Sequence, residues 1–176
     1  MYDGSHLNLE ENIRRTKEVV KLAHLKNVSV EAELGSLALG SYSNEEVAEE
    51  VYTKPEEAQK FAEETKVDAL AVSIGTVHGM YQGEPNINMD ILENINNIVN
   101  TPLVLHGGSG TPEKTIRECI ARGITKINVN TEISLYVMNK IKNTLIEEDN
   151  LHFSVLSMEI RETVKEIVKR YIKLFA

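Results

Sequence analysis

Two histidines stand out because each follows a short apolar run and directly precedes a glycine. His78 comes soon after the run at residues 69–74, and His106 comes directly after the run at residues 103–105. The carboxyl ends of parallel strands are where α/β proteins build their sites. Neutral imidazole is a ligand that Zn²⁺ prefers. The pair therefore indicates a metal site, although one such histidine alone is equally typical of a hydrogen-bonded structural residue.

A glycine-rich turn at residues 107–110 follows the second histidine and precedes a helix-like segment. Glycines let a ligand approach the backbone closely, and a helix N-terminus carries partial positive charge. Asn128, Asn130 and Thr131 end the next strand-like run. Phosphate sites in (β/α)8 barrels often use the loops after neighbouring late strands. The two segments together predict a phosphate cradle.

Carboxylates also lie at the ends of strand-like runs. Asp3 and Glu33 hold such positions, and either is a candidate for the same cavity. Glu31 precedes Glu33 by two residues and so points to the same face of its strand. The remaining histidines lie in helical or loop contexts and are interpreted as surface residues: His6, His24 and His152.

Strand-like and helix-like segments alternate along the chain. The expected strands are a stub at 1–3 and the runs 28–34, 69–74, 103–106 and 126–129. The expected helices are 8–26, 55–66, 89–99, 112–122, 132–147 and 155–175. Asn8, with Glu11 as its reciprocal partner, and Thr111 are the expected N-caps of two of these helices. The alternation predicts a parallel sheet with right-handed crossovers.

This α/β pattern favours a (β/α)8 TIM barrel, and the absence of a GxGxxG motif after the first strand leaves dinucleotide binding without support. Such a barrel typically has about 250 residues, whereas this chain has 176. We therefore expect a single incomplete barrel domain over 1–176, limited to about the last five strand–helix units. Three N-terminal βα units are expected to be absent.

The loop at 35–53 is longer than the usual βα connection of about 2–6 residues. Its acidic residues are Glu45, Glu46, Glu49 and Glu50. A mobile lid over the site and a solvated loop entering a short helix are equally good interpretations.

Composition narrows the class of protein. The formal charge of −8 argues against a nucleic-acid partner. The lone Cys119 is expected to be a small core residue, and it fits a reducing compartment. No apolar run approaches the length of about 20 residues that spans a bilayer, and no signal peptide is visible. We expect a soluble cytoplasmic protein without a membrane partner.

In five of its segments the chain resembles class II, metal-dependent fructose-bisphosphate and tagatose-bisphosphate aldolases. The matching segments occur in the order and spacing of that family and cover nearly the whole chain: 2–6, 30–35, 74–79, 103–110 and 126–132. The resemblance implies a (β/α)8 barrel that is dimeric or larger.

The resemblance also implies roles for individual residues. His78 and His106 match two of the three histidines that hold the catalytic Zn²⁺, and Glu33 and Asp3 match a possible second metal position. The residues that match the cradle for a substrate phosphate and a nearby monovalent cation, Na⁺ or K⁺, are Gly79, Gly107, Gly108, Ser109, Asn128, Val129, Asn130 and Thr131.

The chain also departs from the family pattern. The third zinc histidine and the catalytic aspartate of the family lie at the end of an earlier strand, for which this sequence has no counterpart. The loop at 36–44 lacks the family's glycine-rich acidic signature, for which Glu45 and Glu46 are possible substitutes. Residues 150–156 lack an arginine that many members have.

The resemblance implies zinc-dependent, reversible cleavage of a ketose 1,6-bisphosphate to dihydroxyacetone phosphate and glyceraldehyde 3-phosphate in glycolysis or related carbohydrate metabolism. Fructose and tagatose substrates remain open, and this chain alone is expected to be inactive. The alternative is a non-catalytic remnant or partner subunit that binds phosphate or oligomerises. A class I aldolase with a Schiff-base lysine is disfavoured, because Lys126 precedes the expected core of its strand.

We also expect a homo-oligomer, because an incomplete barrel leaves strand edges unpaired. The last helix adds an apolar stripe that either packs on the sheet or joins two subunits. Its members are Ile160, Val164, Ile167, Val168, Tyr171, Ile172 and Phe175.

Overall fold

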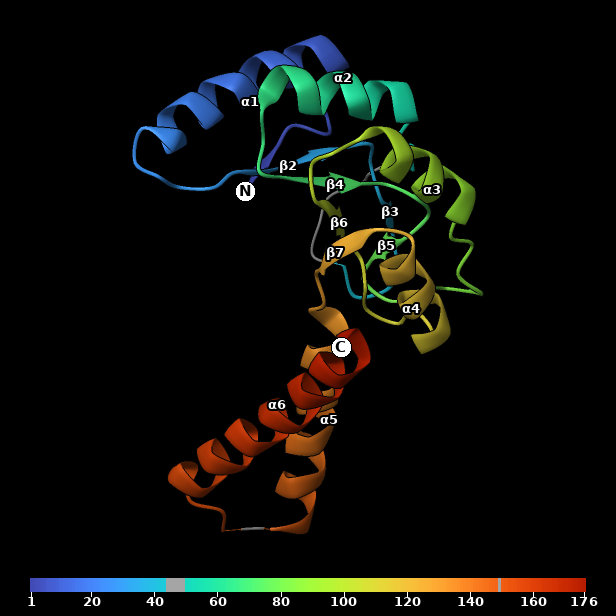
Figure 1. Ribbon diagram of the computed structural model, residues 1–176. Coiled ribbons are helices and arrows are strands. Elements are labelled where there is room, and N and C mark those ends of the chain that lie inside the picture. Colours follow the sequence, from blue (N-terminus) through green and yellow to red (C-terminus); the bar gives the residue numbers. More distant parts are fainter. Residues whose placement is uncertain (44–49, 149) are drawn as a thin grey trace.

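The computed structural model describes residues 1–43, 50–148 and 150–176, and its centre is a five-stranded parallel sheet (Figure 1). The strand order is β1-β2-β4-β6-β7, so β1 and β7 are the edges. The strands are β1 (Tyr2–Asp3), β2 (Glu31–Leu34), β4 (Ala69–Val72), β6 (Leu103–Leu105) and β7 (Ile124–Ile127). The expected parallel sheet of about five strands is confirmed.

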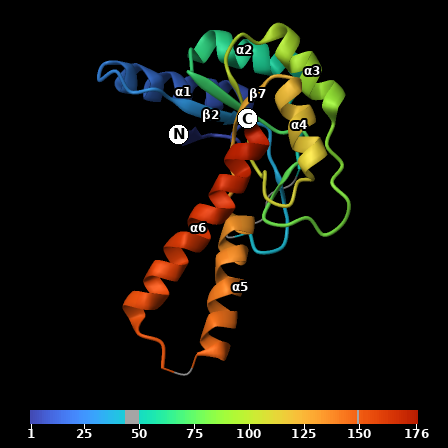
Figure 2. The ribbon, with the colours of Figure 1, turned by 60° about the horizontal axis from the view of Figure 1, so that its bottom comes forward.

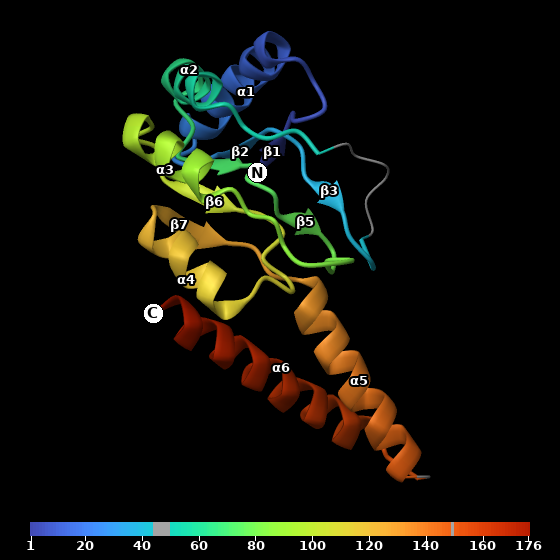
Figure 3. The same ribbon diagram turned by 90° about the vertical axis from the view of Figure 1, so that its right-hand side faces the viewer.

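Four amphipathic helices connect the strands and lie in a row along one face of the sheet (Figures 1 and 3). They are α1 (Leu9–His24), α2 (Pro55–Thr65), α3 (Met89–Ile98) and α4 (Glu113–Ala121). Asn8 caps α1 through a hydrogen bond from the Glu11 backbone N–H. The reciprocal half of this cap was a wrong prediction, because the Glu11 carboxylate pairs with Arg14 and Arg15. The N-cap of α4 is Pro112, one residue later than the expected Thr111.

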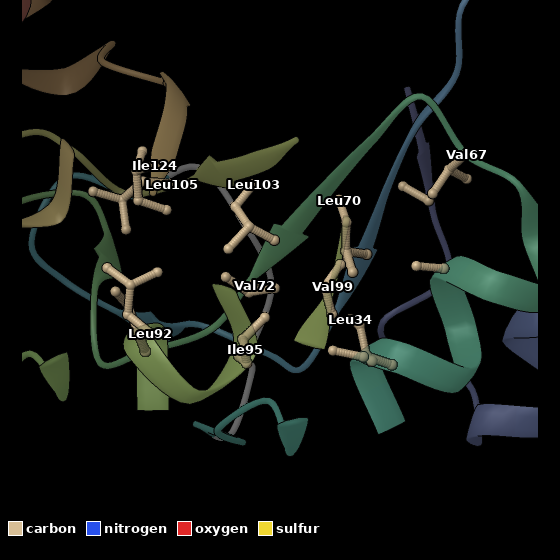
Figure 4. Packing of buried hydrophobic residues seen from close by; sticks show 14 of the residues in the cluster. Leu34, Val67, Leu70, Val72, Leu92, Ile95, Val99, Leu103, Leu105 and Ile124 are labelled. Carbon is tan, nitrogen blue, oxygen red and sulfur yellow. The ribbon is translucent and has the colours of Figure 1, made fainter. Parts of the chain in front are cut away.

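The period of two along each strand separates a core face from an inner face. Leu70, Leu103 and Leu105 pack with the helices in the apolar core, as Figure 4 shows. Their neighbours along the strands point the other way. In β2 this alternation places both glutamates on the inner face, because Ala32 and Leu34 belong to the core. The inner face is therefore where the polar candidates gather.

All five strands depart from their expected bounds, and two of them begin two or more residues away from the expected start. β7 begins at Ile124 rather than at residue 126, because its exposed Thr125 and Lys126 hide an edge strand from a search for apolar runs. β2 begins only at Glu31. Val28 is 54% exposed, and Val30 is buried in the core but precedes the paired residues of the strand.

A second, two-stranded parallel sheet was not expected. It pairs β3 (Ala38–Leu39) with β5 (Val77–His78), and the register places Leu39 opposite His78. His78 therefore lies on a short strand beside the main sheet rather than at the end of β4. Both strands are only two residues long, which explains why no alternating pattern revealed them.

The last two helices form an antiparallel hairpin that projects from the sheet domain (Figures 1 and 2). They are α5 (Thr131–Glu147) and α6 (Phe153–Phe175). The carboxyl half of the predicted stripe is buried at Ile167 and Tyr171, and α6 packs there against α4. Val164 and Ile172 remain exposed. The stripe thus serves packing for part of its length.

Part of the proposed lid lies outside the described residues, namely Glu45, Glu46 and Glu49. Among the described residues, no helix combines the length and apolar character needed to cross a membrane. Cys119 is fully buried on α4, as expected, and burial raises the pKa of its thiol to about 11.

Candidate functional site

His106 follows β6 directly and lies between two carboxylates of β2. Its Nδ1 is 2.9 Å from Glu33 Oε2, and its Nε2 is 3.1 Å from Glu31 Oε1. The side chains of His106 and Glu33 are 4% and 3% exposed, so this contact is shielded from water. The alternation along β2 explains the arrangement, because residues two apart point to the same face. The expected common orientation of the two glutamates is confirmed.

Charge explains how this buried cluster is stable. Burial alone lowers the pKa of His106, but the hydrogen bonds to Glu33 and Glu31 raise it by more, and the net pKa shift is upward. Burial raises the pKa of Glu31, but hydrogen bonds from Lys126 and His106 hold that pKa below its usual value. The carboxylates therefore favour a cation at the ring, whether that cation is a proton or a metal ion.

His78 reaches the same place from β5. The ring centroids of His78 and His106 are 6.0 Å apart, with an angle of 33° between the ring planes. Gly107 permits this approach, because its φ is +67° and a Cβ there would lie 2.3 Å from the Val77 carbonyl oxygen. A residue with a side chain at this position would push the backbone before His78 away.

The two rings fit part of a zinc site. Zn–N bonds of about 2.0–2.1 Å place two imidazoles on one ion with their centroids roughly 5–6 Å apart. Metal-binding histidines usually give their second nitrogen to a carboxylate. Here both nitrogens of His106 contact a carboxylate, Nδ1 that of Glu33 and Nε2 that of Glu31, so a metal ion can bind this ring only where one of the two carboxylates leaves its nitrogen. Among the residues that the structure describes, however, no group of three His, Cys, Asp or Glu side chains is placed to hold a metal. Two histidines fall one protein ligand short of the three that a catalytic zinc site uses.

A cavity of about 540 Å³ connects His78 with the glycine-rich turn. Its wall includes seven of the eight residues predicted to bind phosphate, all except Gly108: Gly79, Gly107, Ser109, Asn128, Val129, Asn130 and Thr131. Tyr42 and Ser43 also line it and carry no signal in the sequence. Ile127 completes the lining. The structure therefore brings the two predicted halves of the site together.

Ser109 has a contact that the sequence did not suggest. Its Oγ accepts the backbone N–H groups of Asn130 and Glu132, each at 3.2 Å, at the start of α5. The N–H of Thr131, between them, meets no acceptor within the described residues. Gly110 N–H donates to the Glu132 carboxylate at 2.9 Å. In the cradle, the N–H groups of Asn130, Glu132 and Gly110 are therefore bonded to protein oxygens, whereas that of Thr131 is available to an anion.

Gly108 packs against the segment at the end of β7 and so helps to position the cradle. Its N–H donates to the Asn128 carbonyl oxygen at 3.0 Å, and a Cβ there would lie 2.7 Å from Ile127 Cγ2. The residue lies in a loop, yet that loop is buried against β7. A bulky substitution at Gly108 is therefore expected to affect the fold as well as the binding of phosphate.

Two other candidates lie elsewhere than expected. Asp3 pairs in register with Glu33, but it is exposed and its Oδ1 accepts the Ser5 backbone N–H at 2.9 Å. Lys126 was expected to precede the core of its strand. It lies within β7 on the inner face, where its Nζ is 2.8 Å from Glu31 Oε2. Its spacing of two from Asn128 is the sequence signal that could have placed it there. The three histidines interpreted as surface residues are all exposed.

Comparison with known proteins gives a consistent result. The family model described as fructose-bisphosphate aldolase class-II matches residues 1–176. A fructose-bisphosphate aldolase of Staphylococcus aureus is 42% identical over 177 residues, which are 99% of this chain and 61% of the relative.

Solved structures agree. The crystal structure of the YdjI aldolase from Escherichia coli K12 is 40% identical and superposes with a TM-score of 0.85, over 100% of this chain and 60% of that one. A fructose-bisphosphate aldolase from Campylobacter jejuni, 23% identical, has a TM-score of 0.70 over 96% of this chain and 57% of that one, and supports the fold alone. The chain thus spans about 60% of the length of the proteins it matches.

Proposed function

Because the chain belongs to the class II fructose-bisphosphate aldolase family, we propose that it contributes the phosphate cradle and two metal ligands of an aldolase site. The reaction is the reversible aldol cleavage of a ketose 1,6-bisphosphate, fructose or tagatose, to dihydroxyacetone phosphate and glyceraldehyde 3-phosphate. One observation carries this proposal. A single cavity is lined by both His78 and the cradle residues of the glycine-rich turn and the start of α5.

In this proposal His78 and His106 hold Zn²⁺, and Glu33 offers a second metal position. When bound, zinc supplies Lewis-acid stabilisation of negative charge that develops on the substrate oxygens. The protein's part is to hold the His106 ring. Glu31 would hold the Nε2 of this ring, and Nδ1, which contacts Glu33 in this structure, would be the nitrogen that turns to the metal.

The cradle binds one substrate phosphate through those backbone N–H groups that protein oxygens do not occupy, which excludes Gly108, Asn128 and Asn130 as N–H donors. Its members are Gly79, Gly107, Gly108, Ser109, Asn128, Val129, Asn130 and Thr131. The positive end of α5 favours an anion there. The carbonyl oxygens that line the same turns suit Na⁺ or K⁺ beside the phosphate. The negative charge of the chain does not oppose this, because the binding depends on local dipoles.

The proton-transferring carboxylate of the family has no counterpart among residues 1–176, so we propose that this chain alone does not catalyse the reaction. Its domain is then the last five units of a barrel. The presence of only two histidines at the candidate metal position among the described residues also favours a second candidate, a non-catalytic chain that binds phosphate esters. We place either function in cytoplasmic carbohydrate metabolism, because the chain belongs to an aldolase family and its single cysteine fits a reducing compartment.

We also propose self-association. The edge strands β1 and β7 have unpaired sides, and the tip of the helical hairpin exposes Leu145, Ile146 and Phe153 by 52%, 78% and 78%. Apolar groups that are exposed together often mark an interface. Sedimentation of the purified chain tests this, and a monomer at all concentrations would contradict it.

A cleavage assay tests the enzymatic proposal. Release of dihydroxyacetone phosphate from fructose and tagatose 1,6-bisphosphates would be measured with Zn²⁺, for the chain alone and for the chain fused to the part of the YdjI aldolase that it does not match. We expect activity in the fusion only. His106→Asn should abolish it, whereas Gly83→Ala should preserve it, because a Cβ at Gly83 meets no atom within 4 Å.

The result also separates the two candidates. A folded fusion that binds Zn²⁺ and phosphate esters but cleaves neither sugar would favour the non-catalytic chain. A fusion that binds no phosphate ester would contradict both.

A further inference from the structure

We propose that the ion pair between Lys126 and Glu31 positions the His106 ring. Lys126 also contacts Asn128, and through this contact it connects the metal side of the site to its phosphate side. This inference deepens the proposed function and rests on it for its catalytic consequence. Its structural content depends only on contacts among the described residues.

Four side chains from three strands form one continuous series of polar contacts. His106 Nε2, after β6, is 3.1 Å from Glu31 Oε1 on β2. The other oxygen of that carboxylate, Oε2, is 2.8 Å from Lys126 Nζ on β7. The same ammonium group donates to Asn128 Oδ1 at 2.7 Å. Each oxygen of Glu31 thus has its own partner, and the carboxylate cannot rotate without losing both.

The strand order explains why a lysine is needed. β2 and β6 are not neighbours, because β4 lies between them, and β7 follows β6 at the edge. Glu31 must therefore reach past β4, where Ala69 and Ala71 leave room on the inner face. The register pairs Val104 with Lys126, so that the lysine side chain projects from the inner face at the level of the strand before His106. Its four-carbon stem is long enough to meet the glutamate.

Burial distinguishes this pair from the ion pairs on the helices. The Glu31 side chain is 13% exposed and that of Lys126 is 50% exposed, so the contact sits at the border between protein and solvent. Exposed pairs contribute little because water screens them. Here the carboxylate is desolvated and touches a buried imidazole, so loss of the lysine charge is transmitted to the ring.

Through its contact with Asn128, the Lys126–Glu31 pair should also affect the phosphate side of the site. Asn128 lines the cavity that holds His78 and the cradle, and with Lys126 and Glu31 it also lines a second cavity of about 530 Å³. Lys126 therefore contacts one residue on the metal side of the site, Glu31, and one on its phosphate side, Asn128. Loss of the lysine should disturb zinc binding and phosphate binding together, whereas loss of the Glu31 charge should disturb zinc binding alone.

The test uses the full chain and two probes, Zn²⁺ and inorganic phosphate, without sugar substrate. The variants are Glu31→Gln, Lys126→Met, the double variant and Lys126→Arg, which keeps the charge. Lys60→Met is the matched control, because it removes another lysine–glutamate pair, with Glu10, on helices away from the site. Thermal melting confirms that each variant folds. A ¹⁵N-detected signal of the His106 ring N–H, assigned with His106→Asn, reports the ring directly.

We expect Glu31→Gln to weaken zinc binding by roughly 10-fold or more. Lys126→Met should weaken it by a similar factor and should also weaken phosphate binding. The double variant should bind zinc no more weakly than Glu31→Gln, because residues in one series are not additive. The ring N–H signal should broaden in both single variants, recover in Lys126→Arg and remain unchanged in Lys60→Met.

The proposal is overturned if Lys126→Met leaves the ring signal and the zinc affinity at wild-type values, or if the single effects add fully in the double variant. If Glu31→Gln does not fold, the half-exposed Lys126 variants decide alone. Absence of aldolase activity in the fusion would refute the enzymatic proposal and leave these readouts unaffected.

Discussion

The chain contains two histidine–carboxylate pairs with the same separation and opposite surroundings. At the carboxyl end of the sheet, His106 and Glu33 are 2.9 Å apart with side chains 4% and 3% exposed. At its amino end, His24 and Asp68 are also 2.9 Å apart, but they are 42% and 41% exposed. The contact distance is therefore no guide to what each pair does.

Burial accounts for the difference. Charges in the protein interior interact strongly and are costly to leave unpaired, whereas water screens a surface pair. The exposed pair joins the end of α1 to the turn before β4 and also holds the Val30 backbone N–H at 2.7 Å. The His24–Asp68 pair thus fastens α1 to the start of β4 and has a structural role. The buried pair holds the His106 ring in place, with its centroid 6.0 Å from that of His78 at the wall of the cavity.

The largest effect should come from removing the buried carboxylate. Glu33→Ala leaves the His106 ring with Glu31 as its one remaining carboxylate partner, and we expect a loss of about 2–3 kcal/mol in the free energy of unfolding. Urea denaturation measures this. Glu33→Gln is the control, because it keeps the volume and a hydrogen-bonding oxygen and should cost less. A loss below that of Asp68→Asn would break the comparison.

Substitution of a buried residue that carries no charge should reduce the free energy of unfolding by less. Ser109 is 3% exposed, and its Oγ accepts two backbone N–H groups near the start of α5. Ser109→Ala should cost about 1 kcal/mol, as for the loss of a helix cap. Inorganic phosphate should recover part of this loss, because its oxygens can accept the freed N–H groups. A phosphate-independent loss would show that the cradle does not bind the anion there.

The smallest effect should come from Asp68→Asn. We expect a loss below about 1 kcal/mol near neutral pH, measured by thermal melting. The hydrogen bonds from His24 and from the Val30 N–H lower the pKa of Asp68 in the folded chain. Its contribution is therefore full above the unfolded pKa, about 3.9, and is lost as the pH falls through the lower folded value.

The melting difference between wild type and Asp68→Asn should accordingly shrink as the pH is lowered below about 4. It should also shrink at high salt, since an exposed pair is screened. A difference that grows on acidification would contradict the assigned sign.

The sequence was sufficient to predict the regular part of the fold. Apolar runs and helical periodicity predicted the five strands of the main sheet, their parallel pairing and the six helices found in the described part of the chain, because the core face of the sheet repeats a strong pattern. The bounds of β7 were missed because Thr125 and Lys126 on an edge strand look like a loop. The two-stranded sheet of β3 and β5 was missed because its strands are too short for any period to show.

The sequence likewise predicted one part of the candidate site and missed another. Spacing after the strands predicted that His106 and the glycine-rich turn lie at the same end of the sheet, and the cavity unites His78 with that turn. Spacing could not give the contacts across the sheet. The series from His106 to Lys126 depends on strand order and register, which bring together residues separated by most of the chain.

The central claim is that His78 and His106 together hold a metal beside the cradle. Titration of the ¹⁵N-histidine-labelled chain with Zn²⁺, followed through the ring nitrogens of all five histidines, tests it most directly. The account predicts weak binding in which the His78 and His106 signals shift with one common midpoint, and in which His106→Asn removes the response of both. A zinc response confined to the exposed His6, His24 and His152 would contradict it.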